Sequence, residues 1–171
     1  MMEGLHAHLP HLLIWGLVAT TAMTTILLAS QGLGLTRLSL PFLVGTVFTG
    51  NRDRAIVVGF IFYVIGGWIF AFLYFLFFAS IQRATWWLGA VLGVLHGVFL
   101  LVCALPLLAH VHPRMASEHD GPRRIYMLEP PGFLALNYGF RTPLTTLLAQ
   151  AVYGATLGGL AHLGGAFGDG G

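Results

Sequence analysis

Four long apolar stretches without a charged residue in their interiors constrain this chain more than any other feature. They run over residues 11–30, 55–79, 86–109 and 142–162. A membrane core about 30 Å thick needs about 20 apolar residues, because each helical residue rises by about 1.5 Å. Lipid offers the backbone no hydrogen bonds, so each stretch is predicted to be a helix. The predicted fold is therefore an all-α integral membrane four-helix bundle.

The scarcity of charged residues excludes several classes of protein. Only 8% of the 171 residues are charged, whereas a soluble domain carries about 25%. A soluble globular enzyme and a disordered chain are both inconsistent with this composition. The single cysteine excludes a disulfide within the chain. The net charge of +2 comes without a basic stripe, so no nucleic-acid partner is expected.

Arginine placement predicts how the chain is threaded through the membrane. The connections 31–54 and 110–141 share one side of a four-span topology and hold seven of the eight arginines. Only Arg83 lies on the other side. Since positive residues concentrate in cytoplasmic loops, both connections are predicted to be cytoplasmic and both termini to lie outside. The predicted organisation is an extracytoplasmic tail over 1–10, one four-span transmembrane domain over 11–162, and a glycine-rich tail over 163–171.

A shorter apolar segment, residues 38–50, lies between the first and second spans. Its apolar run is about 12 residues, which is too short to cross a membrane, and Pro41 and Gly45 interrupt it. We expect a short interfacial or re-entrant helix here. The interfacial placement is favoured, because irregular backbone inside a membrane persists only against protein or a water-filled cavity.

Small residues predict how the spans pack against one another. Lipid tails are as apolar as leucine, so helices associate through close backbone approach and a few hydrogen bonds. The third span carries a stripe of glycines four residues apart, and the fourth span offers two at the same spacing: Gly89, Gly93 and Gly97, then Gly154 and Gly158. Packing inside the bundle is favoured over a dedicated dimer interface.

Aromatic residues and the cysteine indicate which faces meet lipid. Trp15, Trp86 and Trp87 are predicted to lie near the outer headgroups, whereas Trp68 is predicted to pack inside the bundle. Cys103 is interpreted as a small apolar core residue. The phenylalanines of the second span are expected to face mainly lipid or a partner protein: Phe60, Phe62, Phe70, Phe72, Phe75, Phe77 and Phe78.

A layer of polar residues is predicted near the middle of the membrane. His96 lies ten residues into the third span, and residues of the first and fourth spans fall at similar depth: Thr20, Thr24, Gln150 and Tyr153. One reading is a substrate or proton site, because histidine changes charge near neutral pH. The other is hydrogen-bonded packing, worth about 0.6 kcal/mol per bond. The spans contain no interior carboxylate, which favours the structural reading.

A polar cluster follows the third span and is the candidate metal site. It consists of His110, His112, Glu118 and His119. Imidazole and carboxylate groups suit zinc and other divalent metals. Their spacing matches no established metal motif, so a polar loop is favoured and a divalent metal stays an alternative.

No cofactor is expected from the remaining motifs. His11 and His162 lie at similar depth, but haem needs facing histidines and a flat slot, so haem is disfavoured. The sequence has no phosphate loop, dinucleotide fingerprint, Ser/His/Asp arrangement or H-E-x-x-H. An enzyme is therefore disfavoured.

The second connection is long for a link between two helices and is the expected place for a partner contact. Its segment Leu128-Glu129-Pro130-Pro131-Gly132 is stiff, because prolines favour extended polyproline geometry. Such an element presents Glu129 and Phe133 to a partner or returns the chain to the membrane.

Three strings of the sequence, HPRMASEHDGPRR, LEPPGFLALNYG and TPLTTLLAQAVYGATLGG, resemble a family of uncharacterised four-span bacterial inner-membrane proteins. The resemblance covers nearly the whole chain. It implies a multi-pass bundle in a bacterial inner membrane. It implies no activity, substrate or catalytic residue.

Three functional hypotheses follow. The first is a non-catalytic subunit or scaffold that binds the lipid bilayer and another membrane protein, or a second copy of itself. The second is a small oligomeric carrier or channel that uses the polar layer around His96. The third is a metal- or haem-associated redox membrane protein.

Overall fold

The computed structural model describes residues 2–116 and 127–167, with side chains from residue 10 onward. Over these residues the chain is helical apart from its connections, and the sole β feature is an isolated bridge between Met115 and Leu128. The elements are α1 (Met2–Gly32), α2 (Leu40–Phe48), α3 (Arg52–Ile81), α4 (Trp86–Phe99), the π-helix η1 (Leu100–Ala104), α5 (Leu105–Val111), the 3-10 helix η3 (Phe133–Tyr138) and α6 (Thr142–Leu163). The all-α class is confirmed.

Four helical stretches are long and apolar enough to cross a membrane. They are Pro10–Gly32, Arg52–Ile81, Trp86–Val111 and Thr142–Leu163, with 23, 30, 26 and 22 residues. Each contains one of the four predicted spans. Helix α1 begins at Met2, so helical backbone also runs through the segment predicted as a tail.

The chain forms two compact units, each assembled from separate parts of the sequence. The first unit comprises Met1–Ile26, Val64–His96 and Leu147–Gly171. The second unit comprises Leu27–Tyr63 and Gly97–Thr146. All four long helical stretches contribute residues to both units.

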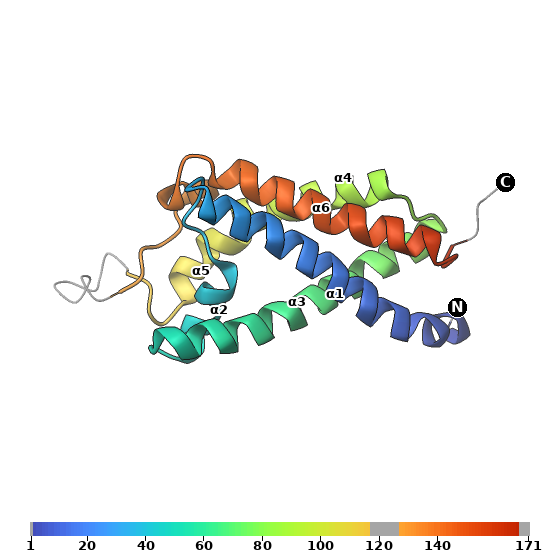
Figure 1. The fold of residues 1–171 in the computed structure, drawn as a ribbon, viewed down its shortest axis with the longest axis horizontal. Coiled ribbons are helices and arrows are strands. Elements are labelled where there is room, and N and C mark those ends of the chain that lie inside the picture. The colour runs from blue at the N-terminus through green and yellow to red at the C-terminus, as the bar shows by residue number, and fades with distance from the viewer. Residues whose placement is uncertain (1, 117–126, 168–171) are drawn as a thin grey trace. The chain divides into compact units, whose positions relative to one another are not determined.

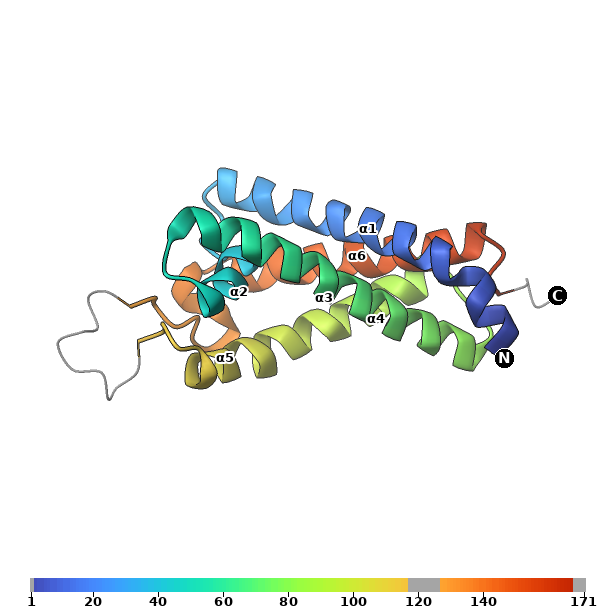
Figure 2. The ribbon, with the colours of Figure 1, turned by 90° about the horizontal axis from the view of Figure 1, so that it is seen from below.

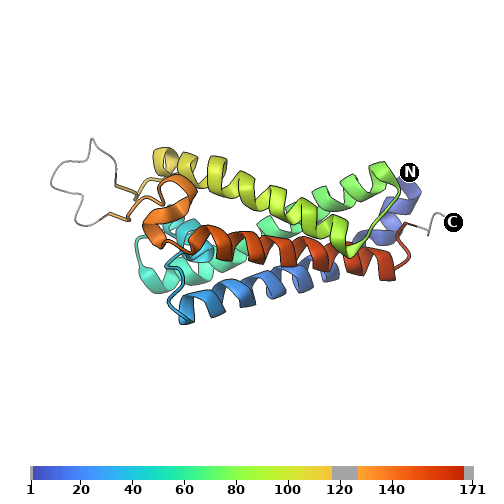
Figure 3. The ribbon, with the colours of Figure 1, turned by 90° about the horizontal axis from the view of Figure 1, so that it is seen from above.

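In the first unit, α4 packs against α6 through glycines (Figure 3). A Cβ atom added at Gly89 would lie 2.0 Å from the carbonyl oxygen of Gly154, and one at Gly93 would lie 2.1 Å from that of Gln150. A Cβ at Gly158 would lie 2.2 Å from the carbonyl oxygen of Thr85. The two backbones therefore touch at small residues, which let helices approach closely in membrane proteins. Gly97 is buried in the second unit.

The same unit brings α1 against α3 (Figure 2). Thr20 faces Gly67, since a Cβ there would lie 2.2 Å from the threonine Oγ1. Trp68 covers Gly16 and donates a hydrogen bond of 3.0 Å from Nε1 to the carbonyl oxygen of Leu13. An indole N–H inside an apolar bundle needs such an acceptor.

In the second unit, α2 lies against the first turns of α3 and near α5 (Figure 1). A Cβ at Gly45 would lie 1.7 Å from the carbonyl oxygen of Ala55, and one at Gly59 would lie 1.8 Å from that of Pro41. With nine residues, α2 is about 14 Å long, which is too short to span a membrane. Its interfacial or re-entrant placement stays a prediction.

The third span changes its hydrogen-bonding pattern before Pro106. The π-helix η1 precedes α5, and Leu105 donates its backbone N–H to the carbonyl oxygen of Leu100, five residues back. Pro106 lacks a backbone N–H and stands in the first turn of α5. The π-turn therefore changes the backbone hydrogen-bond register directly before Pro106, the residue that has no N–H to donate.

Several aromatic placements differ from expectation, and so does that of the cysteine. Trp15 is buried against Gly164 instead of lying at a lipid surface, and Phe75 and Phe78 are buried because they share one face of α3 with Tyr74. Cys103 is exposed on η1, since it lies two residues, or roughly 200° of helical rotation, beyond the buried Leu101.

Candidate functional site

Three aromatic rings in the first unit surround the imidazole of His96. Its Nδ1 lies 3.4 Å from the Tyr74 hydroxyl oxygen, and its ring centroid lies 4.0 Å from that of Phe70. The Tyr153 ring stands 6.4 Å from His96 and 5.5 Å from Tyr74. The Tyr153 hydroxyl donates to the carbonyl oxygen of Gly67 at 2.6 Å. The imidazole is thus held in an aromatic cage with one weak polar contact.

The other predicted members of the polar layer are placed differently. Thr20 and Gln150 are 1% and 3% exposed. Thr24 is only partly buried, and its hydroxyl donates to the backbone of its own helix at Thr20. Among the described residues, three buried side-chain atoms of this unit have no hydrogen-bond partner: Thr20 Oγ1, His96 Nε2 and Gln150 Oε1. Such atoms are suited to a small polar ligand, because leaving them unpaired costs about 1–3 kcal/mol each.

Tyr74 and Phe70 belong to this cluster, but counting residues from the start of each span to estimate depth did not select them. Tyr74 lies seven residues before the end of α3 at Ile81, whereas His96 lies ten residues after the start of α4 at Trp86. The sequence signal that could have identified Tyr74 is a tyrosine within a phenylalanine-rich run, since a buried phenol needs a polar partner.

The predicted metal cluster is only partly within the described residues. Glu118 and His119 lie outside them. His112 is buried and uses both ring nitrogens: Nδ1 accepts from the Arg114 backbone N–H at 3.1 Å, so Nε2 donates to the Leu43 carbonyl oxygen at 3.1 Å. His110 is exposed and bonds through Nδ1 to the Pro106 carbonyl oxygen at 3.1 Å. The described residues contain no group of three or more potential metal ligands.

His112 and Arg114 instead fix the C-terminal end of α2. The Arg114 guanidinium donates from Nη1 to the carbonyl oxygens of Thr46 and Val47 at 2.6 and 2.9 Å. His112 Nε2 also lies 3.2 Å from the Thr46 hydroxyl. A positive group at a helix C-terminus satisfies free carbonyls and complements the helix dipole.

The two long connections meet in the second unit. Arg37, from the first connection, forms an ion pair with Glu129 at 3.2 Å and donates to the backbone oxygen of Asn137. The Arg37 backbone N–H donates to the carbonyl oxygen of Tyr138 at 2.7 Å. The Tyr138 hydroxyl donates to the Glu129 carbonyl oxygen at 2.5 Å, and Asn137 Nδ2 donates to that of Pro130 at 2.9 Å.

This network holds η3 in an unusual backbone conformation. Leu134 and Ala135 both have positive φ angles, of 54° and 55°. Non-glycine residues seldom adopt this region, and they persist there only when neighbouring contacts determine the conformation. Gly132 and Gly139 flank them with φ of 71° and 131°, which glycine adopts without steric cost.

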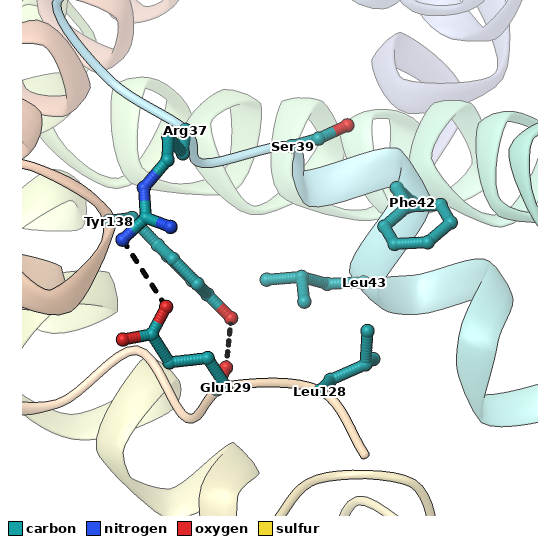
Figure 4. A pocket seen from close by; sticks show the side chains of 7 residues that line it. All are labelled: Arg37, Ser39, Phe42, Leu43, Leu128, Glu129 and Tyr138. Atoms are coloured by element: carbon teal, nitrogen blue, oxygen red, sulfur yellow. Dashed lines mark hydrogen bonds and ion pairs between the residues drawn. The ribbon is translucent and has the colours of Figure 1, made fainter. Parts of the chain in front are cut away.

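A cavity of about 230 Å³ opens beside the ion pair (Figure 4). Its lining combines the two charges with apolar side chains: Arg37, Ser39, Phe42, Leu43, Leu128, Glu129 and Tyr138. Burial is the main cause that raises the pKa of Tyr138 to about 12; the Glu129 carboxylate adds to the rise and Arg37 opposes it. The phenol therefore stays neutral at physiological pH and keeps its hydrogen bond.

Four helical stretches are long and apolar enough to cross a membrane, so the fold is compatible with a multi-pass membrane protein. Comparisons with protein-family models, curated proteins and solved structures found no match for this chain.

Proposed function

We propose that this chain is a non-catalytic subunit or scaffold of a larger assembly in a bacterial inner membrane. The observation that carries this proposal is a rigid element outside the spans that exposes two aromatic side chains. Phe133 is 65% exposed and Phe140 is 89% exposed, at either end of η3. In a loop surrounded by water, two such exposed rings are unfavourable unless another surface covers them.

The backbone of this element is fixed before any partner binds. Arg37, Asn137 and Tyr138 tie η3 to the first connection and to the proline pair before it. Ordering a loop on binding costs free energy, so a preorganised loop binds more tightly for the same contact. Exposed aromatic residues on a rigid support are typical anchors of protein interfaces.

The arginine distribution supports a cytoplasmic position for this element, with both termini outside. Seven of eight arginines lie in the two connections. A membrane-impermeant label applied to sealed cells should then reach a cysteine placed at residue 163 and fail to reach one placed at residue 140, each in a Cys103→Ser background. The reverse pattern would exclude this orientation.

The partner is another membrane protein or a second copy of the chain, and gentle extraction followed by intact-mass measurement tests this. The wild type should appear in an assembly of defined stoichiometry. The double variant Phe133→Ser, Phe140→Ser should lose its partner with an unchanged melting temperature. Leu33→Ser, at a 74% exposed position outside the same element, is the matched control and should keep the partner. A double variant that keeps its partner contradicts the proposal.

One observation favours a second candidate, a small oligomeric carrier or channel. The first unit contains three buried polar atoms without partners in the described residues, around His96 and Gln150. Polar groups inside a membrane often mark a substrate path. If His96→Ala abolishes a measured liposome flux and leaves the melting temperature unchanged, the carrier is supported over the scaffold. A flux that His96→Ala leaves intact excludes it.

A further inference from the structure

The cavity of the second unit combines features of a lipid-headgroup site. It is lined from both connections, and two of its lining residues, Arg37 and Tyr138, lie close in sequence to the ends of apolar spans. Arg37 follows the end of the first span at Gly32 by five residues, and Tyr138 precedes the start of the fourth at Thr142 by four. Both span ends lie on one side of a four-span chain, so the cavity lies near the level of the headgroups.

Arg37 and Glu129 can each exchange the other for a charged group of a ligand. Arg37 and Glu129 touch through one nitrogen and one oxygen at 3.2 Å, and their side chains are 68% and 50% exposed. Exposed pairs of this kind contribute little stability. The Arg37 guanidinium uses only Nη2 for its hydrogen bonds to described residues, which leaves its other side-chain donors for an anion. A ligand with both charges can satisfy both side chains.

Apolar groups form the rest of the lining. Phe42 and Leu43 project from α2, and Leu128 faces them from the second connection (Figure 4). A volume of about 230 Å³ is smaller than the roughly 300–1,000 Å³ of sites that enclose a whole drug-sized ligand. A cavity of this volume fits a small charged group that is attached to a larger apolar molecule.

We propose that this cavity binds the headgroup of a zwitterionic phospholipid, a phosphoethanolamine. The phosphate lies at Arg37, the ammonium group lies at Glu129, and the first acyl carbons contact Phe42, Leu43 and Leu128. Charge-assisted hydrogen bonds to phosphate and carboxylate are the strong ones, and the primary ammonium donates to a carboxylate whereas a choline cannot. A purely anionic headgroup is repelled by Glu129.

The test is retention of lipid by the purified protein, measured by native mass spectrometry after exchange with defined lipids. We expect phosphatidylethanolamine to be retained about ten-fold more than phosphatidylcholine or phosphatidylglycerol. Arg37→Gln should lower its retention about ten-fold. Glu129→Gln should lower it similarly and remove the discrimination against phosphatidylglycerol. Equal retention of the three lipids by the wild type would overturn the proposal.

Controls separate the site from general charge and folding effects. Arg52→Gln and Asp53→Asn change an exposed arginine and an exposed acid at the start of α3, outside the cavity, and should leave retention unchanged. Leu128→Trp keeps both charges but fills the cavity, so it should exclude the lipid even if Arg37→Gln fails to fold. If the control variants match the cavity variants, or Leu128→Trp retains the lipid, the site is wrong.

Soluble glycerophosphoethanolamine distinguishes a lipid from a free headgroup. The lipid assignment predicts that it displaces phosphatidylethanolamine at least about a hundred-fold less effectively than a short-chain phosphatidylethanolamine, because it lacks the acyl carbons that contact the apolar lining. Equal competition would assign the cavity to a soluble zwitterion and reject the lipid.

Discussion

Both units contain close glycine contacts, at Gly89 and Gly154 in the first and at Gly45 and Gly59 in the second, but among the described residues only the second adds charged side chains that bind backbone carbonyls. In the first unit, α4 meets α6 at glycines, with carbonyl oxygens where a Cβ would otherwise stand. In the second unit, side chains of Arg37, His112 and Arg114 donate to backbone carbonyls of separate segments. The difference follows from the surroundings that the sequence predicts: lipid favours close backbone contact, whereas segments outside the spans can keep charged side chains hydrated.

The largest expected effect comes from filling the glycine contact. Gly89→Ala places a Cβ 2.0 Å from the carbonyl oxygen of Gly154, where only backbone can yield. We expect a loss of about 3 kcal/mol in the free energy of unfolding, the upper range for overpacking. Thermal unfolding in detergent measures it.

The matched control for this substitution, Gly66→Ala, should change the free energy of unfolding in the opposite direction. Gly66 lies in α3 with no atom within 4 Å of an added Cβ. Gly66→Ala should stabilise the protein by about 0.5–1 kcal/mol, because alanine loses less backbone entropy in a helix. If both variants shift the melting temperature in the same direction, close contact does not explain the first unit.

The next effect tests the cap on α2. Arg114→Met keeps an extended side chain but removes the donors to the Thr46 and Val47 carbonyl oxygens. We expect a loss of about 2 kcal/mol, since bonds to charged groups contribute about 1.5–3 kcal/mol. Hydrogen exchange should rise in α2. Arg54→Met, whose side chain bonds to no described residue, should leave exchange there unchanged.

A pH titration addresses the network at η3. The pKa of Tyr138 is raised from 10.0 to about 12 in the folded chain, first by burial. The unfolded phenol ionises first, so stability is fully present below pH 10 and is lost as pH rises toward 12. At pH 11 we expect a loss of about 1 kcal/mol relative to pH 9. Tyr138→Phe should abolish this part of the melting-temperature change; an unchanged pH profile in that variant rejects the assignment.

The smallest effect compares two buried hydroxyls of the first unit. Tyr153 donates to the Gly67 carbonyl oxygen at 2.6 Å, whereas the Tyr74 hydroxyl lies 3.4 Å from His96. Tyr153→Phe should cost about 0.6 kcal/mol, the average for hydrogen bonds between membrane helices. Tyr74→Phe should cost less than half of that. Equal losses would show that the two contacts do not differ in strength.

The four helices long enough to span a membrane were predictable because a charge-free apolar run of about 20 residues has few alternative structures. Each predicted span lies within an observed helical stretch. The short helix before the second span was also predictable, from an apolar run too short to cross, but Pro41 was expected to interrupt the run and instead stands in the first turn of the helix. Its close crossing was not, because Gly45 and Gly59 meet only through the fold.

The candidate sites were less predictable than the helices. Depth counting selected His96 and Tyr153 but not Tyr74, since it measures the position of a Cα and not the reach of a long side chain. The hydrogen bonds between Arg37 and η3 join residues 100 positions apart in the sequence. No local pattern encodes such a pair, whereas the glycine spacing is local and repeats with the helix.

The outward-facing Cys103 has a practical consequence, because it is the one cysteine of the chain. A nitroxide attached to this native thiol can measure the depth of η1 in a membrane without engineered cysteines. Collision rates with dissolved oxygen and with a water-soluble nickel complex then report directly whether η1 is immersed in a bilayer.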